Sequence, residues 1–168
     1  MADVIENKVA KSGLITLDLE ELMPRWEIVG FDMADVLWQG LALKEKDFRA
    51  FVKDHDWSAY NGKQVYIHNS ADAIIPTWAY MLLGAALDAH ADLVVVGPER
   101  DLNAALWARF VTAFQASQYA DQRVILKGCG SVDIPESVYL QLSQKLVKQV
   151  KTLMFGEPCS TVPVFKKK

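Results

Sequence analysis

The sequence predicts an α/β domain with a parallel-sheet core. Three short runs rich in β-branched residues lie near residues 64–68, 92–96 and 123–127, and the middle run is almost wholly apolar. Such runs suit strands that are covered on both faces, as in a parallel sheet. A helical pattern follows each run, and this alternation is typical of right-handed βαβ crossovers. We therefore expect a single three-layer domain over residues 1–168, with these strands as parallel neighbours in one sheet.

Three prolines mark the expected helix starts. Proline belongs in the first turn of a helix, because its φ is already helical and its missing N–H would have had no partner there. In the last helix, apolar residues recur at steps of three or four until Gly156 and Pro158 indicate its end. The expected helices run from Pro76 to about His90, from Pro98 to about Ser117 and from Pro135 to about Phe155.

The N-terminal part adds further elements to this core. Residues 14–19 alternate apolar and polar side chains, and residues 27–31 indicate a second strand. Residues 45–55 are typical of a short helix with Phe48 and Phe51 turned inward. We expect these strands at the sheet edges, where antiparallel pairing would make the sheet mixed. Because no linker rich in Pro, Gly or Ser separates the halves, one domain is the simpler interpretation.

Two of the βα loops share a sequence pattern. A Ser-x-Asp motif begins at Ser70 and again at Ser131, and each is followed by a proline and then by a tyrosine four residues later, at Tyr80 and Tyr139. The spacing from the serine to the proline is two residues longer in the first loop than in the second. This pattern leaves two interpretations open, a recurrent loop conformation and an internal duplication.

The composition excludes several classes of protein. With 51% hydrophobic and 23% charged residues, the chain is globular. A net charge of −3 with both signs interspersed gives no basic surface that would collect nucleic-acid phosphates. The polar N-terminus does not resemble a secretory signal, and no apolar run reaches the roughly 18 residues of a membrane span. We expect a cytoplasmic protein with reduced thiols and no nucleic-acid or membrane partner. A homo-oligomer and a protein partner are left open.

The first candidate site follows the strand at 64–68. In parallel sheets, ligands bind outside the carboxyl ends of the strands, where βα loops and helix N-termini meet. Asn69, Ser70 and Asp72 lie there, just before a helix, which predicts a ligand or metal site. The alternative is that Ser70 and Asp72 make only loop or capping hydrogen bonds. His68 ends the strand as a candidate metal ligand, base or structural histidine, and Trp57 either packs in the core or lines a pocket.

The second candidate site contains a thiol. Cys129 and Ser131 follow the strand at 123–127, and glycines on both sides of the cysteine permit close approach of a ligand. A thiolate is favoured ahead of a helix N-terminus, although Cys129 could equally be a small buried hydrophobe. Cys129, Cys159 and His68 form a candidate metal set, since two cysteines alone cannot close a tetrahedral site. A final helix of about 20 residues would span roughly 30 Å, so Cys159 could meet Cys129 only through a shorter or bent helix or in a dimer whose tail reaches the partner's site. We therefore expect Cys129 alone, with Ser131 and the first loop, to be the ligand position.

Six longer motifs allow a comparison with known families. They are Leu14–Leu19, Leu43–Arg49, His55–Ser58, Ser70–Tyr80, Lys127–Cys129 and Phe155–Pro163. Together they resemble a bacterial family catalogued as domain of unknown function 2480, over nearly the whole chain. The resemblance implies no established activity. It also implies an association with iron–sulfur cluster assembly, which would give the two cysteines a context.

Three functions are left open by the sequence. The first is a small-ligand or metal and thiol site at the carboxyl ends of the strands, with a metal ion or an iron–sulfur cluster as candidate cofactor. The second is an enzyme acting on a small anionic metabolite, with Ser70 and Asp72 at the helix N-terminus. The third is a non-catalytic interaction module in which both cysteines are packing residues. Glycine-rich nucleotide-binding loops, the G-x-S-x-G elbow and H-E-x-x-H are all missing from the sequence.

Overall fold

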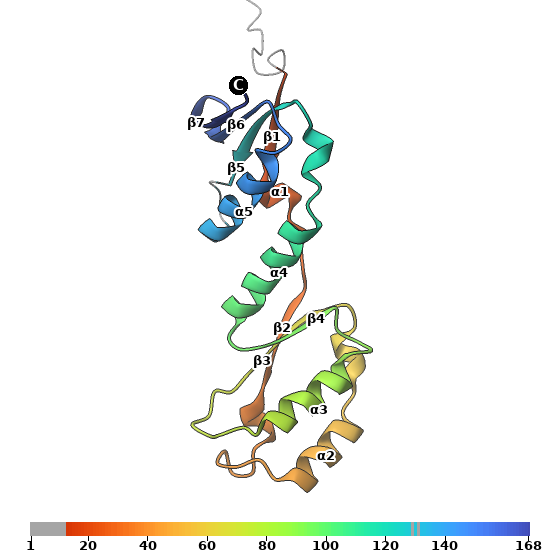
Figure 1. Ribbon diagram of the computed structural model, residues 1–168. Coiled ribbons are helices and arrows are strands. Elements are labelled where there is room, and N and C mark those ends of the chain that lie inside the picture. Colours follow the sequence, from red (N-terminus) through yellow and green to blue (C-terminus); the bar gives the residue numbers. More distant parts are fainter. Residues whose placement is uncertain (1–12, 129, 131) are drawn as a thin grey trace, which may run out of the picture. The chain divides into compact units, whose positions relative to one another are not determined.

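The structure, a computed structural model, describes residues 13–128, 130 and 132–168 and confirms the α/β class (Figure 1). No helix within these ranges is long and apolar enough to cross a membrane. The chain divides into two compact units, and each contains its own sheet. Unit 1 comprises Met1–Pro24 and Trp107–Lys168, and unit 2 comprises Arg25–Leu106.

Unit 2 contains a parallel sheet in the order β2-β3-β4. Its strands are β2 (Ile28–Asp32), β3 (Gln64–His68) and β4 (Leu93–Val96). Its helices are the 3-10 helix η1 (Met33–Val36), α2 (Glu45–Asp54), the 3-10 helix η2 (Trp57–Tyr60) and α3 (Thr77–Leu87). Val65 and Ile67, on one face of β3, share a buried core with Phe48 of α2 and Leu83 of α3. Both helices therefore cover the same face of this sheet.

Unit 1 contains a mixed sheet in the order β1-β5-β6-β7, in which only the β6–β7 pair is antiparallel. Its strands are β1 (Leu14–Asp18), β5 (Arg123–Lys127), β6 (Thr152–Glu157) and β7 (Ser160–Lys166). Its helices are α1 (Leu19–Leu22), the 3-10 helix η3 (Ala116–Tyr119) and α5 (Glu136–Leu146), whereas α4 (Glu99–Ala113) begins in unit 2 and ends in unit 1. The expectation of a mixed sheet is confirmed.

Most of unit 1 repeats unit 2 at a constant offset of 59 residues. β3 and β5 begin at Gln64 and Arg123, and α3 and α5, each of 11 residues, begin at Thr77 and Glu136. The same offset relates η2 to η3 and β4 to β6. The buried side chains follow it too, so that Ala79, Leu83 and Leu87 of α3 correspond to Val138, Leu142 and Leu146 of α5.

The first strand of each unit, β1 in unit 1 and β2 in unit 2, also takes an equivalent place, but here the strand of unit 1 comes first and the offset is shorter. β1 begins 14 residues before β2, at Leu14 and Ile28. Leu14 lies opposite Arg123 in β5, and Ile28 lies opposite Gln64 in β3. Because Gln64 and Arg123 are themselves equivalent, each first strand joins its sheet in the same register.

An unusual turn is also repeated. The N–H of Gly62 donates to the carbonyl of His90, and the N–H of Asp121 donates to the carbonyl of Gln149, both at 2.9 Å. Gly62 and Asp121 both have positive φ, of 70° and 55°. Shared strands, helices, register and turn together favour internal duplication over a recurrent loop alone.

The prediction of one sheet is wrong. The strand at 123–127 pairs with β1 and β6, whereas the strand at 64–68 pairs with β2 and β4. These strands therefore do not form one sheet between two helical layers. The two N-terminal strands lie at sheet edges, as expected, but their antiparallel pairing is wrong, because both pair in parallel. Helices separate each first strand from its partner, and such a connection is what parallel pairing requires. The single domain over residues 1–168 stays a prediction.

The three predicted helix starts are confirmed. Pro76, Pro98 and Pro135 each lie directly before the first helical residue. Their carbonyls accept hydrogen bonds of 2.9 Å from the N–H groups three residues later. None of them lies inside a helix, so the loops before these helices have the expected lengths.

The predicted end of the last helix is wrong. α5 ends at Leu146, and the residues that follow turn back into β6. Val150 and Leu153 fit the helical stripe but are buried in the core of unit 1 after the turn and on the strand. A short apolar segment fits both a helical step and strand alternation, so periodicity alone did not separate the two.

Candidate functional site

Unit 2 has a pocket of about 390 Å³ at the carboxyl ends of β3 and β4. Two of the predicted site residues, His68 and Asn69, line it. The rest of the wall comes from Tyr66 and Ile67 of β3, Tyr80 of α3 and the segment Val96–Glu99 between β4 and α4. This is the edge at which parallel sheets bind ligands.

Asp32, at the end of β2, holds this edge of the sheet together. Its Oδ1 accepts hydrogen bonds from the N–H groups of Ala34 at 2.9 Å and Ser70 at 3.0 Å, and its Oδ2 lies 3.9 Å from Nδ1 of His68. Desolvation opposes ionisation of Asp32. The hydroxyl and N–H of Ser70, the N–H of Ala34 and the charge of His68 outweigh it and lower the pKa of Asp32 to about 2. Asp32 is therefore a fixed carboxylate beside His68.

Asn69 shapes the loop that follows β3. Its Nδ2 donates to the carbonyl of Ala73 at 2.9 Å, and its Oδ1 accepts from the N–H of Ala71 at 3.2 Å. Ser70 is exposed and bonds to the carboxylate of β2, as the loop-bonding interpretation expects. Asp72 is exposed and has no polar partner among the described residues. Of the three predicted polar residues in this loop, Asn69 is the one that lines the pocket.

Sequence reasoning missed Tyr66 and Tyr80. The ring of Tyr66 covers Gly30 of β2, where a Cβ would collide with the phenol, and it stacks on His68 with a centroid distance of 5.3 Å. The hydroxyl of Tyr80 has no hydrogen-bond partner within the described part of the chain. The signal that could have identified Tyr80 is the proline–tyrosine spacing that it shares with Tyr139.

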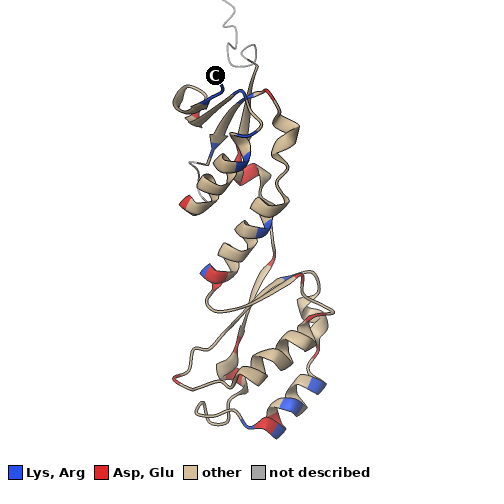
Figure 2. Cartoon of the chain, in the orientation of Figure 1, with Lys and Arg blue, Asp and Glu red and all other residues tan. Residues whose placement is uncertain are grey.

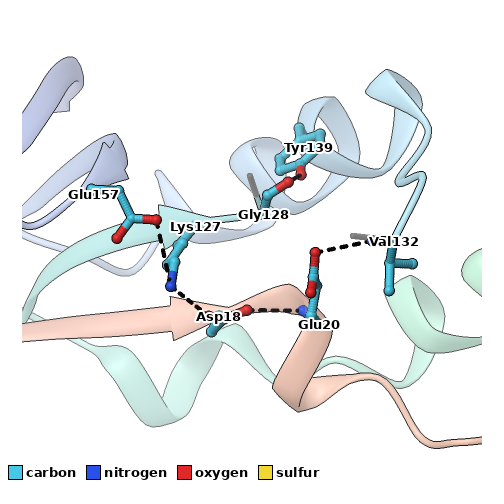
Figure 3. Close-up of polar contacts among 7 residues, drawn as sticks. All are labelled: Asp18, Glu20, Lys127, Gly128, Val132, Tyr139 and Glu157. Carbon is cyan, nitrogen blue, oxygen red and sulfur yellow. Dashed lines mark hydrogen bonds and ion pairs between the residues drawn. The ribbon is translucent and has the colours of Figure 1, made fainter. Parts of the chain in front are cut away.

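Side chains of unit 1 itself fill the corresponding edge of that unit (Figure 3). Lys127 is equivalent to His68, and its Nζ lies 3.0 Å from Oδ2 of Asp18 and 3.4 Å from Oε1 of Glu157. The hydrogen bond with Asp18 raises the pKa of Lys127, and the same bond lowers the pKa of Asp18. Asp18 is equivalent to Asp32. Both units therefore end the first strand in a carboxylate, but only unit 1 pairs that carboxylate with a lysine.

Tyr139 and Phe155 occupy the part of unit 1 that corresponds to the pocket. The hydroxyl of Tyr139 donates to the carbonyl of Gly128 at 2.7 Å, as Figure 3 shows. Phe155 packs edge-on against Tyr139 with a centroid distance of 5.5 Å, at the position equivalent to Val96. A Cβ on Gly128 would collide with the Tyr139 hydroxyl, so glycine permits this close approach. Unit 1 thus has an aromatic contact and a hydrogen bond where unit 2 is open.

Cys129 and Ser131 lie outside the described residues, so their ligand role stays a prediction. Among the residues that the structure does describe, no group of three or more His, Cys, Asp or Glu side chains could hold a metal ion. His68 belongs to unit 2 and Cys159 to unit 1. The metal set of these two residues with Cys129 likewise stays a prediction.

Cys159 is an exposed free thiol in the turn between β6 and β7. β6 runs parallel to β5 and brings the chain back to the carboxyl edge, where Glu157 contacts Lys127. The distance argument that separated Cys159 from this edge is therefore wrong, because it assumed a helix where β6 lies.

Trp57 belongs to the core of unit 2. It is 8% exposed, and its Nε1 donates to the carbonyl of Val52 at 2.9 Å. Its ring stacks on Phe31 with a centroid distance of 6.1 Å. The packing interpretation of Trp57 is confirmed.

Comparisons with known proteins agree with the family resemblance in the sequence. A family model described as "Protein of unknown function (DUF2480)" matches residues 3–167, which is nearly the whole chain. No curated protein and no solved structure matches.

Proposed function

Because the chain belongs to this family of proteins of unknown function, membership supplies no activity, and we propose that unit 2 is a small-ligand-binding module. Its site is the pocket at the carboxyl ends of β3 and β4. The observation that carries the proposal is the contrast between the repeats. About 390 Å³ is open beside Tyr80 and Val96, whereas the equivalent Tyr139 and Phe155 contact each other.

The pocket wall suits a ligand with an apolar body and a few polar groups. Ile67, Val96 and the ring of Tyr80 provide apolar surface, and small-molecule sites are mostly lined in this way. The hydroxyl of Tyr80 and the ring of His68 provide polar contacts at the two sides of the strand end. Hydrogen bonds that Asp32 accepts and Asn69 donates fix the loops around these groups, so the site is formed before a ligand arrives.

A fragment screen on the full chain tests this proposal. We expect members of a fragment library to shift the amide signals of His68, Asn69 and Gly97 in spectra of ¹⁵N-labelled protein. The variant Val96→Phe places in the pocket the side chain that unit 1 carries at the equivalent position, and it should abolish these shifts. Phe155→Val makes the reverse exchange in unit 1 and should leave them unchanged. Fragments that bind folded Val96→Phe and wild type equally would contradict the proposal.

A second candidate function is the metal or thiol site, with iron–sulfur cluster assembly as its context. The exposed thiol of Cys159 lies two residues after Glu157, at the edge from which the segment containing Cys129 leaves β5. Metal analysis and thiol titration of untagged protein test this candidate with the variants Cys129→Ser and Cys159→Ser. Metal that is lost in both variants supports a shared site, and protein that holds no metal and has a Cys129 thiol no more reactive than that of Cys159 contradicts it.

A further inference from the structure

In unit 1, a lysine of the unit itself places a positive charge at the carboxyl edge of the sheet. The ammonium of Lys127 lies between Asp18, at the end of β1, and Glu157, at the end of β6 (Figure 3). Such charge-assisted contacts are stronger than neutral ones. This edge of the repeat is therefore built to accept an ammonium group.

Unit 2 keeps the carboxylate but not the lysine. Asp32 is equivalent to Asp18, and its Oδ1 takes the two backbone hydrogen bonds, which leaves Oδ2 directed to the side where His68 replaces Lys127. The separation of 3.9 Å between Oδ2 and Nδ1 of His68 is longer than a hydrogen bond. A negative group at this edge thus has no fixed ammonium beside it.

The wall of the pocket carries one acidic side chain. Glu99 is the only Asp, Glu, Lys or Arg among the described residues that line it. Acidic and basic residues lie together at the start of α4 in Figure 2, where Arg100 is 87% exposed and lies 3.7 Å from Asp101. Glu99 and Asp101 already balance the positive end of the helix dipole. An anionic ligand would therefore meet the carboxylate of Glu99.

Aromatic rings complete the wall. Tyr66 and His68 stack on each other on β3, and Tyr80 adds a third ring from α3. Aromatic faces attract cations through the ring quadrupole, and the attraction grows where water is excluded. The carboxylate of Glu99 and the rings of Tyr66 and Tyr80 around one pocket are a combination that recognises organic ammonium ions.

We infer that the ligand of this pocket is a small organic amine, bound as its ammonium ion beside Glu99 and the tyrosine rings of the pocket wall. Its apolar body packs against Tyr80 and Val96. This inference rests on the proposed function and adds the class of ligand.

Three probes of similar size and different charge test the inference on the full chain. Phenethylammonium, 2-phenylethanol and phenylacetate are titrated while the amide signals of His68, Asn69 and Gly97 are followed. We expect the ammonium probe to bind about tenfold more tightly than the alcohol and the carboxylate to bind most weakly. Added salt should reduce the difference between the ammonium and the alcohol, because it screens charges but not apolar contacts.

A matched pair of variants locates the charge effect. Glu99→Gln should weaken phenethylammonium binding about three- to fivefold and leave 2-phenylethanol binding unchanged. Glu136→Gln changes the first residue of α5 in the same way and should affect neither probe. If the alcohol or the carboxylate binds as tightly as the ammonium, the amine inference is overturned while the pocket proposal stands. If neither these probes nor any library fragment shifts the three signals, both are overturned.

Discussion

The two repeats differ most at the carboxyl edges of their sheets. In unit 1, Tyr139 bonds to the carbonyl of Gly128, and Lys127 is paired with two carboxylates. In unit 2, the equivalent Tyr80 and His68 line a pocket of about 390 Å³. Apart from β7, the strands, the helices and the register are shared, so the pocket arises from a few side chains at the strand ends and not from a different fold.

We therefore expect the shared core residues to determine the stability of both units and the residues at the sheet edges to determine binding. The buried leucines of α3 and α5 are equivalent and should contribute alike to stability. The residues at the carboxyl edges of the two sheets differ in chemistry. Their substitution should therefore change stability or binding in one unit and not in the other. Four substitution experiments test that division.

The largest effect is expected in the two cores. Leu83→Ala and Leu142→Ala each remove a fully buried side chain and should each lower the free energy of unfolding by about 2–5 kcal/mol. Met81→Ala and Leu140→Ala are matched controls at equivalent exposed positions and should change it by less than about 0.5 kcal/mol. Urea unfolding of the full chain followed by circular dichroism measures all four. If the free energy of unfolding fell by less than 1 kcal/mol for only one of the two leucine variants, the repeats would not be equivalent. A single unfolding transition for the whole chain would support the single-domain prediction.

The next effect is on acid stability. The folded-state pKa of Asp32 is about 2 against an ordinary value of 3.8, so ionised Asp32 stabilises the fold. Its contribution is complete above about pH 3.8 and is lost as the pH falls towards 2. Asp32→Asn should lower stability at neutral pH and flatten the pH dependence in that window. Asp72→Asn, at an exposed carboxylate without a polar partner among the described residues, is the control. An unchanged slope in Asp32→Asn would contradict the role of this carboxylate.

A smaller effect distinguishes the two tyrosines. Tyr139→Phe removes the hydrogen bond to Gly128 and should lower the free energy of unfolding by about 1 kcal/mol. Tyr80→Phe removes a hydroxyl without a partner among the described residues and should change it by less than about 0.5 kcal/mol. Thermal unfolding of both variants measures the difference. Equal losses would show that Tyr80 has a structural bond like that of Tyr139.

The smallest effect concerns the repeated turn. Gly62→Ala places a Cβ at a φ of +70°, where no neighbouring atom lies within 4 Å, so backbone strain alone should cost about 1 kcal/mol. Asp121→Gly relieves the equivalent strain but removes an exposed ion pair with Lys167, and the net change should stay within about 0.5 kcal/mol. Calorimetry measures both changes. If Gly62→Ala raised the free energy of unfolding, the positive φ at this position of the repeated turn would carry no strain, contrary to our expectation.

The site was partly predictable from local sequence. His68 and Asn69 follow from the rule that ligands bind beyond the carboxyl ends of parallel strands, and both line the pocket. Tyr66 and Tyr80 did not follow from that rule, because aromatic residues on a strand and a helix are most simply core residues. Asp32 was missed because its role depends on Ser70, 38 residues away in sequence.

The sequence by itself determined the local elements. β-branched runs identified β3, β4 and β5, and prolines located the starts of α3, α4 and α5, because both signals act over a few residues. Only the tertiary structure decided that β5 joins β1 and β6 in a second sheet, and that the segment after α5 is a strand. Strand pairing is set by contacts between residues far apart in the chain, such as those between β1 and β5. Hydrophobic periodicity does not identify the partner of a strand, so the division into two sheets and the pocket at the edge of one of them could not be predicted from it.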